Sequence, residues 1–241
     1  MNDARAGCLV LVPVSLGETA WQRFLPAEAH AEAVSIRHFV VENAKAARAQ
    51  LKRMEHPLPM TELDITPLPP NGPNDELDRL LGPTARGLDV GLMSDAGCPG
   101  IADPGARLVA RAHALNVRVR PLVGPSSILL ALMASGLDGQ RFAFDGYLPV
   151  AEAARDARIR SLEEDSRRQS RTQIFIETPY RNERLFDALL RQARPGTRLC
   201  IACDLTCASE RLVTRSIGEW RTMARPDLAR RPALFLMLAE R

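Results

Sequence analysis

A strand, a helix and a second strand follow one another between residues 88 and 123, and this order constrains the fold more than any other feature of the sequence. Residues 88–93 (LDVGLM) are apolar and β-branched enough for a strand. Residues 106–115 carry apolar side chains at helical spacing, and residues 117–123 alternate as a second strand. Because two strands joined through a helix lie parallel in one sheet, the sequence predicts an α/β fold.

The loop between the first strand and the helix reads SDAGCPGIADPG, residues 94–105. Pro99 and Pro104 each remove an amide donor and the three glycines relax the backbone, so the segment is a shaped loop. In open α/β sheets ligands bind at the carboxyl ends of strands, and Gly97 would let a ligand approach the main chain there. The alternative is a tight turn in which Asp103 caps the helix, which leaves most of the loop unexplained. We therefore expect a site for a small polar ligand.

The remaining sequence continues the alternation and predicts two α/β domains, residues 1–122 and 123–241. The proline-rich residues 57–73 predict a loop or an extended connector. Asn74 or Asp75 is expected to cap a helix over residues 74–81, which Gly82 ends. Further strands are expected at 7–14, 142–148, 172–176, 198–203, 210–217 and 233–239, and further helices at 44–54, 126–135, 152–168 and 182–193.

Composition excludes several classes of protein. The longest apolar runs, residues 128–134 and 233–239, are far shorter than the roughly 20 residues of a membrane span. Asp3, Pro13 and a brief apolar segment argue against a signal peptide, and five cysteines in 241 residues favour reduced thiols in the cytoplasm. A net charge of +3 is compatible with an RNA partner without requiring one.

A second loop, GPSS at residues 124–127, also follows a predicted strand and opens a helix. One serine is expected to cap that helix, and the other offers a hydroxyl to a ligand at the helix N-terminus. The two loops together predict one binding site.

The blocks SDAGCPGIADPGARLV, VRVRPLVGPSS, ASGL, RFAFDGYLP and IFIETPYR occur in this order between residues 88 and 183. They resemble the tetrapyrrole-methylase superfamily (class III methyltransferases), and within it the small-subunit ribosomal RNA (cytidine-2′-O)-methyltransferase family. Weaker similarity lies in ENAKAARAQL at 42–51 and DLTCASE at 204–210. The chain resembles a short variant without the C-terminal extension of longer members.

The resemblance implies two α/β domains with S-adenosyl-L-methionine in the cleft between them. It also implies an RNA substrate, a homodimer and a cytoplasmic role in rRNA processing. Carried over by position, the residues that it places at the cofactor are Pro13, Asp95, Ala96, Gly97, Cys98, Ile101, Ser126, Ser127, Glu177, Leu205 and Ala233. Those that it places at the substrate are Glu42, Lys45 and Arg48.

The sequence departs from the family pattern in three places. The first loop reads PVSLGE at 13–18 where the family has a Gly-Asn-Leu-Gly-Asp run after its proline. Asn43 replaces an acidic residue, and Cys203 and Cys207 stand where the pattern prefers Arg and Lys. These changes bear on the substrate more than on the cofactor.

Methyl transfer from a sulfonium needs alignment and a dry cleft, and no metal. A ribose hydroxyl must also lose a proton, for which Glu42, Asp95, Asp103 and Glu177 are candidate acceptors, although each has an ordinary structural alternative. The catalytic residues therefore stay open.

Two motifs are given ordinary interpretations. Cys200 and Cys203 are three apart on a predicted strand, so their side chains point to opposite faces, and no metal site is expected there. The arginines of residues 155–171 alternate with Glu163, Glu164 and Asp165, which indicates a solvated helix face rather than a track for phosphates.

Two alternatives to an RNA methyltransferase remain at this point. One is a C-methylase acting on a corrin or uroporphyrinogen-type tetrapyrrole, although the sequence lacks the glycine-rich first loop expected of such enzymes. The other is a non-catalytic module that binds the cofactor or RNA. Binding of the methyl donor separates the enzymes from a module that lacks a competent cofactor cleft, and the accepted substrate separates the two enzymes.

Overall fold

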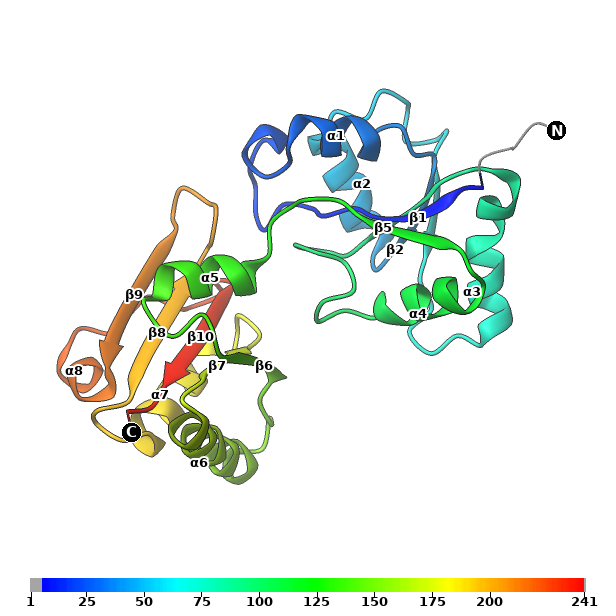
Figure 1. The fold of residues 1–241 in the computed structure, drawn as a ribbon. Helices are drawn as coiled ribbons and strands as arrows, with labels where there is room; N and C mark the ends of the chain where they lie inside the picture. The colour runs from blue at the N-terminus through cyan, green and yellow to red at the C-terminus, as the bar shows by residue number, and fades with distance from the viewer. Residues whose placement is uncertain (1–5, 241) are drawn as a thin grey trace. The chain divides into compact units, whose positions relative to one another are not determined.

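The computed structural model of the protein describes residues 6–240, which form two compact units, one ending at Ser126 and the other beginning at Ser127. Each unit contains a five-stranded sheet covered by helices (Figure 1). The predicted α/β architecture in two parts is thereby confirmed, while the boundary predicted after residue 122 stays a prediction. Within the described residues, no helix is both long enough and apolar enough to cross a membrane.

The first sheet is entirely parallel, in the order β3-β2-β4-β1-β5. Strand β1 lies between β4 and β5 and pairs with both, so that Leu9 lies opposite both Val90 and Val119. This is the arrangement that the strand–helix–strand order predicts. The strands are β1 (Cys8–Leu11), β2 (His38–Val41), β3 (Asp64–Pro67), β4 (Val90–Met93) and β5 (Arg118–Pro121).

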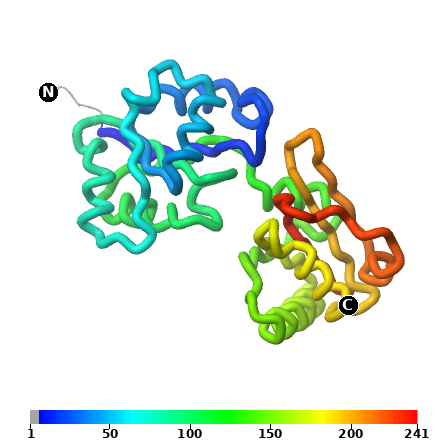
Figure 2. Tube along the Cα trace, turned by 180° about the vertical axis from the view of Figure 1, so that it is seen from behind, coloured from blue at the N-terminus to red at the C-terminus, as the bar shows by residue number. Residues whose placement is uncertain are grey.

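Both faces of this sheet are buried, because successive side chains of a strand point to opposite faces. Cys8 and Val10 belong to a core that includes residues of α1 (Ala27–Ala33) and α2 (Ala44–Arg53). Leu9 belongs to a second core with residues of α3 (Asn74–Leu81) and α4 (Ala106–Ala114). Figures 1 and 2 show these helix pairs on opposite sides of the strands. With both faces covered, the carboxyl edge of the sheet is the place left for a ligand.

The predicted connector at residues 57–73 is wrong in part, because it contains β3. This strand pairs only with β2 and lies at the edge of the sheet. A proline such as Pro67 is tolerated in an edge strand, where one backbone side forms no ladder. Proline content therefore hid a strand whose position makes the proline harmless. Neither β2 nor α1 was predicted.

The predicted cap of α3 is also wrong. Pro73 occupies the N-cap position, and no side chain caps the helix. At the other end the prediction is confirmed, because α3 ends at Leu81 and Gly82 is its C-cap. Gly82 also begins a short 3-10 helix, η2 (Gly82–Arg86). Another short 3-10 helix, η1 (Trp21–Arg23), precedes α1.

The second sheet is mixed, in the order β6-β7-β10-β8-β9, with only β6 and β7 parallel. Its main core gathers residues of three helices with Phe175 and Phe235, whose rings stack at 6.0 Å between centroids. Helix α5 contacts β8, β9 and β10. The elements are α5 (Ser127–Ser135), β6 (Phe142–Tyr147), α6 (Glu152–Gln169), β7 (Thr172–Ile176), α7 (Asn182–Gln192), β8 (Arg198–Cys203), β9 (Arg211–Ser216), α8 (Ile217–Thr222) and β10 (Ala233–Leu238).

Candidate functional site

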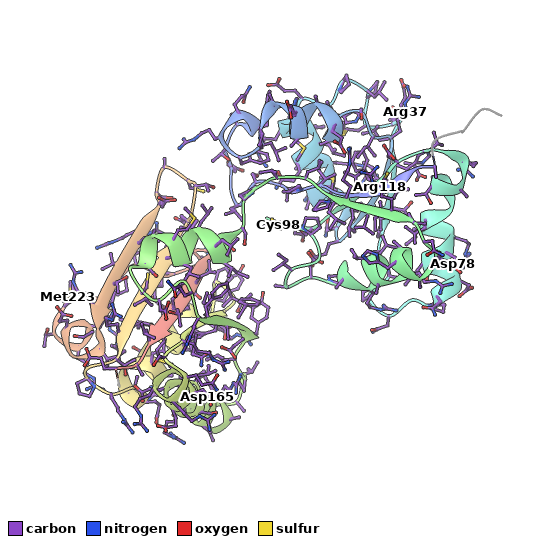
Figure 3. The ribbon with its side chains drawn as sticks, in the orientation of Figure 1. Arg37, Asp78, Cys98, Arg118, Asp165 and Met223 are labelled. Carbon is purple, nitrogen blue, oxygen red and sulfur yellow. The ribbon has the colours of Figure 1, made fainter. Side chains whose placement is uncertain are left out.

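A cavity of about 410 Å³ lies in the first unit, at the carboxyl ends of β1 and β5. It is bordered by the loop after β4, which contains Cys98, labelled in Figure 3. Of the predicted site residues, Pro13, Cys98 and Ile101 line it. The other lining residues are Leu11, Pro99, Gly100, Ala106, Val109, Pro121 and Leu122. Apart from the Cys98 thiol, the lining side chains are apolar, which suits a ligand with an aliphatic or sulfur-containing part.

Asp103 holds the loop of residues 94–105 in shape. Its carboxylate accepts hydrogen bonds from the Gly100 amide at 2.8 Å and from the Gly105 amide at 2.6 Å. Gly105 is the N-cap of α4 and no side chain caps that helix, so the expected helix cap at Asp103 is instead a clamp within the loop. Partial burial raises the pKa of Asp103, although these amide bonds act in the opposite direction.

Gly97 connects the loop of residues 94–105 to the first loop, at Val14 and Leu16, and to the loop that contains Pro125. Its carbonyl accepts the Val14 amide at 2.9 Å, and its φ of +72° lies in the left-handed region that favours glycine. A Cβ on Gly97 would lie 3.2 Å from the Leu16 side chain and 3.5 Å from the Pro125 carbonyl oxygen. The neighbouring Cys98 thiol donates to the same carbonyl at 3.2 Å. Glycine at position 97 is thus required by the backbone and by internal packing, whether or not a ligand approaches it.

Glu42 and Asp95 meet where β2 and β4 end. The Asp95 amide donates to the Glu42 carboxylate at 3.2 Å, and the Glu42 amide donates to the Met93 carbonyl at 3.1 Å. Partial burial raises the pKa of Glu42, and although the Asp95 amide bond acts in the opposite direction, the nearby carboxylates of Asp95 and Asp103 raise the pKa further. Partial burial also raises the pKa of Asp95. Three carboxyl groups near one end of the sheet therefore hold their protons to higher pH than usual.

The departure at Asn43 has a structural explanation. Its side-chain oxygen accepts hydrogen bonds from the amides of Lys45 and Ala46, which makes Asn43 the N-cap of α2. Lys45 and Arg48 follow on the exposed surface of this helix, and neither forms an ion pair with a carboxylate of the described residues. The predicted substrate-side residues thus lie on one short stretch that follows the carboxyl end of β2, namely Glu42, Lys45 and Arg48.

A buried polar contact between the first loop and α2 was not foreseen. The Ser15 hydroxyl donates to the Gln50 side-chain oxygen at 2.9 Å, and Arg53 donates to the same oxygen at 3.1 Å. Ser15 and Gln50 are both buried. The contact anchors the PVSLGE loop in the form that departs from the family pattern. No sequence signal would find it, because the partners are 35 residues apart.

Four of the predicted cofactor residues belong to the second unit, namely Ser127, Glu177, Leu205 and Ala233, and the others belong to the first. Ser127 begins α5. Glu177 follows β7, Leu205 follows β8, and Ala233 begins β10. Leu234 pairs with Ile176, and Ala233 pairs with Cys203. Glu177, Leu205 and Ala233 therefore lie at the same end of three neighbouring strands, β7, β8 and β10. The structure therefore groups the predicted residues into one set in each unit.

Glu177 is already paired inside the second unit. Its buried carboxylate accepts hydrogen bonds from Arg181 at 2.6 and 2.9 Å and from the Thr178 amide at 2.6 Å. All three hydrogen bonds reach the same oxygen, Oε1, which is therefore already occupied by donors of the second unit itself. Among the candidate bases, Glu177 is thus the one that the geometry disfavours.

The cysteines and the arginines of α6 have structural roles. Cys200 and Cys203 are buried in β8, and burial raises the pKa of each thiol to about 11. No group of metal ligands occurs within residues 6–240. Arg158, Arg167 and Arg168 each pair with a carboxylate, as a solvated face predicts. Glu163 differs, because it is buried and accepts the Arg194 amide at 2.7 Å.

Comparison of the sequence with known proteins finds the superfamily that the sequence motifs resemble. The model of Tetrapyrrole (Corrin/Porphyrin) Methylases matches residues 29–220. The ribosomal RNA small subunit methyltransferase I of Pseudomonas aeruginosa is 43% identical over 107 residues, 44% of this chain and 36% of that protein. The protein of the same name from Micromonospora olivasterospora is 35% identical over 182 residues, 75% of this chain and 54% of that protein. The chain spans about half the length, or less, of these relatives.

Solved structures give the same fold. The crystal structure of the methyltransferase CobJ matches with a TM-score of 0.64 and 18% identity, covering 97% of this chain and 94% of that one. Uroporphyrin-III-C-methyltransferase from Thermus thermophilus matches with a TM-score of 0.54 and 17% identity, covering 97% and 92%. At these identities the likeness establishes the architecture alone.

Proposed function

Because the chain belongs to the family of tetrapyrrole (corrin/porphyrin) methylases, we propose that it is an S-adenosyl-L-methionine-dependent methyltransferase acting on a ribose 2′-hydroxyl of small-subunit ribosomal RNA. The family match supports methyl transfer. The names of the relatives, which are ribosomal RNA small subunit methyltransferases, support RNA as the substrate.

The observation that carries the proposal is the cavity at the carboxyl end of the first sheet. Its volume of about 410 Å³ falls within the usual range for small-molecule sites, and its lining is apolar with few polar groups, as such sites are. Pro13, Cys98 and Ile101 would border the aliphatic and sulfur-containing part of the cofactor. The loop that carries them is held by Asp103, so little ordering is needed at binding.

The cofactor supplies an electrophilic methyl group on a sulfonium. The apolar lining of the cavity would exclude water from that group, and the shaped loop would fix its direction. Glu42 is the carboxylate best suited to accept the proton of the hydroxyl, because its pKa is raised toward neutral pH. Its Oε2 accepts the Asp95 amide, and no donor of the described residues reaches its Oε1. Lys45 and Arg48 would bind phosphates next to it.

Two measurements test the proposal. Calorimetry with S-adenosyl-L-homocysteine is expected to show binding, and the absence of heat would favour a non-catalytic module that lacks a competent cofactor cleft. Labelled S-adenosyl-L-methionine is then offered with small ribosomal subunits that lack the modification, or with uroporphyrinogen III. Label is expected in the RNA and in its ribose. Label in the tetrapyrrole alone would replace this proposal with the C-methylase.

The expected homodimer and the cytoplasmic location belong to the same proposal. A protein that modifies ribosomal RNA works where ribosomes are assembled. Sedimentation equilibrium of the purified chain measures the mass in solution, and a mass of twice 26.5 kDa is expected. A monomer that still binds cofactor would remove the dimer from the proposal and leave the activity in place.

A further inference from the structure

A second cavity, of about 280 Å³, lies between α6 and α7 in the second unit. These two helices pack against each other on one side of the sheet (Figure 1). The cavity is polar, and three of its lining side chains are arginines. The lining residues are Val150, Glu152, Arg155, Arg184, Asp187 and Arg191.

Both carboxylates of this cavity are already neutralised by particular arginines. Glu152 pairs with Arg191 at 3.0 Å, and Asp187 pairs with Arg225 at 2.7 Å. These pairs account for every acidic lining residue. Arg191 also lies 3.7 Å from the Asp156 carboxylate, so the ion pairs of the described residues involve Arg191 and leave the other two lining arginines without a paired carboxylate.

Arg155 and Arg184 are the arginines left over. Arg155 is only 8% exposed, and its Nε is buried with no hydrogen-bond partner. Within the described residues its side chain forms one hydrogen bond, from Nη1 to the Val150 carbonyl, which is long at 3.4 Å. Arg184 lies on the exposed surface of α7, and no carboxylate of the described residues pairs with either guanidinium. A buried charge without a counterion is costly, and proteins rarely retain one without a partner.

The start of α6 adds to the positive potential of this cavity. Ala151 is the N-cap, and it provides no side-chain acceptor for the first amides of an 18-residue helix. Val150 and Glu152, on either side of this cap, both line the cavity. Uncapped helix N-termini attract anions, and phosphate groups in particular.

We propose that the cavity between α6 and α7 binds a phosphate group through Arg155, Arg184 and the first amides of α6. The planar guanidinium forms paired hydrogen bonds that match phosphate oxygens, and two guanidinium groups supply the charge that a phosphate needs. The phosphate comes either from the free ion or from the backbone of RNA. The second source rests on the proposed function, whereas the first does not.

Inorganic phosphate is the first probe. Thermal unfolding of the full chain is compared in sodium phosphate and in sodium chloride at equal ionic strength. Phosphate is expected to raise the midpoint of the wild type in a saturable manner. Arg155→Met and Arg184→Met are expected to lose this rise. Arg167→Met is the matched control, because it removes the same charge from an exposed pair of α6 and is expected to keep the rise.

Arg155→Met also separates binding from a structural role. Since the buried charge is unpaired without phosphate, its removal is expected to leave the midpoint in chloride no lower than that of Arg167→Met. A large fall in chloride with the phosphate response retained would overturn the proposal. So would a wild type that responds equally to phosphate and chloride.

Fluorescence anisotropy with a ten-nucleotide single-stranded RNA identifies the source. If the phosphate belongs to RNA, Arg184→Met binds about tenfold more weakly than Arg167→Met, and inorganic phosphate competes. If the two variants bind RNA equally while Arg184→Met has lost the phosphate response, the free ion is the ligand. A wild type that binds no RNA counts against the proposed function, whereas one that ignores phosphate counts against this cavity.

Discussion

The main-chain amide of Asp95 donates a hydrogen bond to the Glu42 carboxylate, with 3.2 Å between Asp95 N and Glu42 Oε2. The residues are 53 apart in sequence and meet because β2 and β4 are neighbours in the sheet. The contact joins the substrate-side residues that the sequence predicts to the loop that borders the cavity.

Replacing Glu42 with Gln tests its role as proton acceptor. Only ionised Glu42 can take a proton, and because its folded pKa is raised above the ordinary 4.5, activity is expected to fall with decreasing pH earlier than for an ordinary carboxyl group. Glu42→Gln is expected to lower kcat by about 10²-fold and to remove this acid limb. Methyl transfer measured between pH 5 and 9 checks both effects.

The control for Glu42 is Asp95→Asn, which keeps the backbone amide that Glu42 accepts. It is expected to retain the acid limb, shifted to lower pH because one neighbouring negative charge is gone. If Glu42→Gln kept the wild-type pH profile, Glu42 would not be the acceptor. The unfolding free energy of Glu42→Gln at pH 7 is expected to be no lower than that of the wild type, since the ionised carboxylate is partly desolvated.

Gly97→Ala tests the loop junction. Its φ of +72° costs an alanine about 1–2 kcal/mol, and the added Cβ would press on Leu16 at 3.2 Å. Gly136→Ala is matched to it, because Gly136 has φ +67° with no atom within 4 Å of an added Cβ. Both variants are expected to lose stability in urea denaturation, and Gly97→Ala is expected to lose more because of the contact with Leu16. Only Gly97→Ala is expected to bind S-adenosyl-L-homocysteine at least about tenfold more weakly in calorimetry. Equal affinities would place the cofactor elsewhere.

Local pattern predicted most elements of both sheets, because strands such as β7 and helices such as α4 carry their periodicity within one short segment. It failed where tertiary context decided. Pro67 is acceptable only because β3 is an edge strand, which the sequence does not state. The loop of residues 94–105 was predicted from its composition, whereas its contact with Glu42 depends on the order of strands in the sheet.

Roles of single residues were harder to predict than positions. Glu177 was a candidate base, yet its partner Arg181 lies only four residues on, a spacing that is visible in the sequence. Glu163 was expected on a solvated face, but its helix turns it into the core toward Arg194. In both cases the residue type was compatible with two environments, and only packing chose between them.

Arg181→Met is expected to destabilise the second unit strongly. The Glu177 carboxylate has a side-chain exposure of 2%, and removing its partner leaves a buried charge, at a cost of about 3–5 kcal/mol. The control is Arg167→Met, which breaks an exposed pair with Glu164 and is expected to cost at most about 1 kcal/mol. Urea denaturation measures both. A double variant, Glu177→Gln with Arg181→Met, is expected to recover part of the loss, and its failure to do so would contradict the explanation.

Thiol labelling tests the burial of β8. With a pKa of about 11, Cys200 and Cys203 are thiolate in roughly one molecule in a thousand at pH 8, and both are buried. Iodoacetamide at pH 8, followed by peptide mass spectrometry, is expected to modify the half-buried Cys207 before Cys200 and Cys203. Prompt labelling of Cys200 in the folded chain would show that the strand opens readily. Labelling all three in urea gives the reference.

Because Asp103 closes its loop with donors from the loop itself, the shape of this segment does not wait for a ligand. Capture of the methyl donor is then expected to show a single concentration-dependent phase in stopped-flow traces, without a slower rearrangement behind it. Turnover would be paced by later events, such as release of the methylated product.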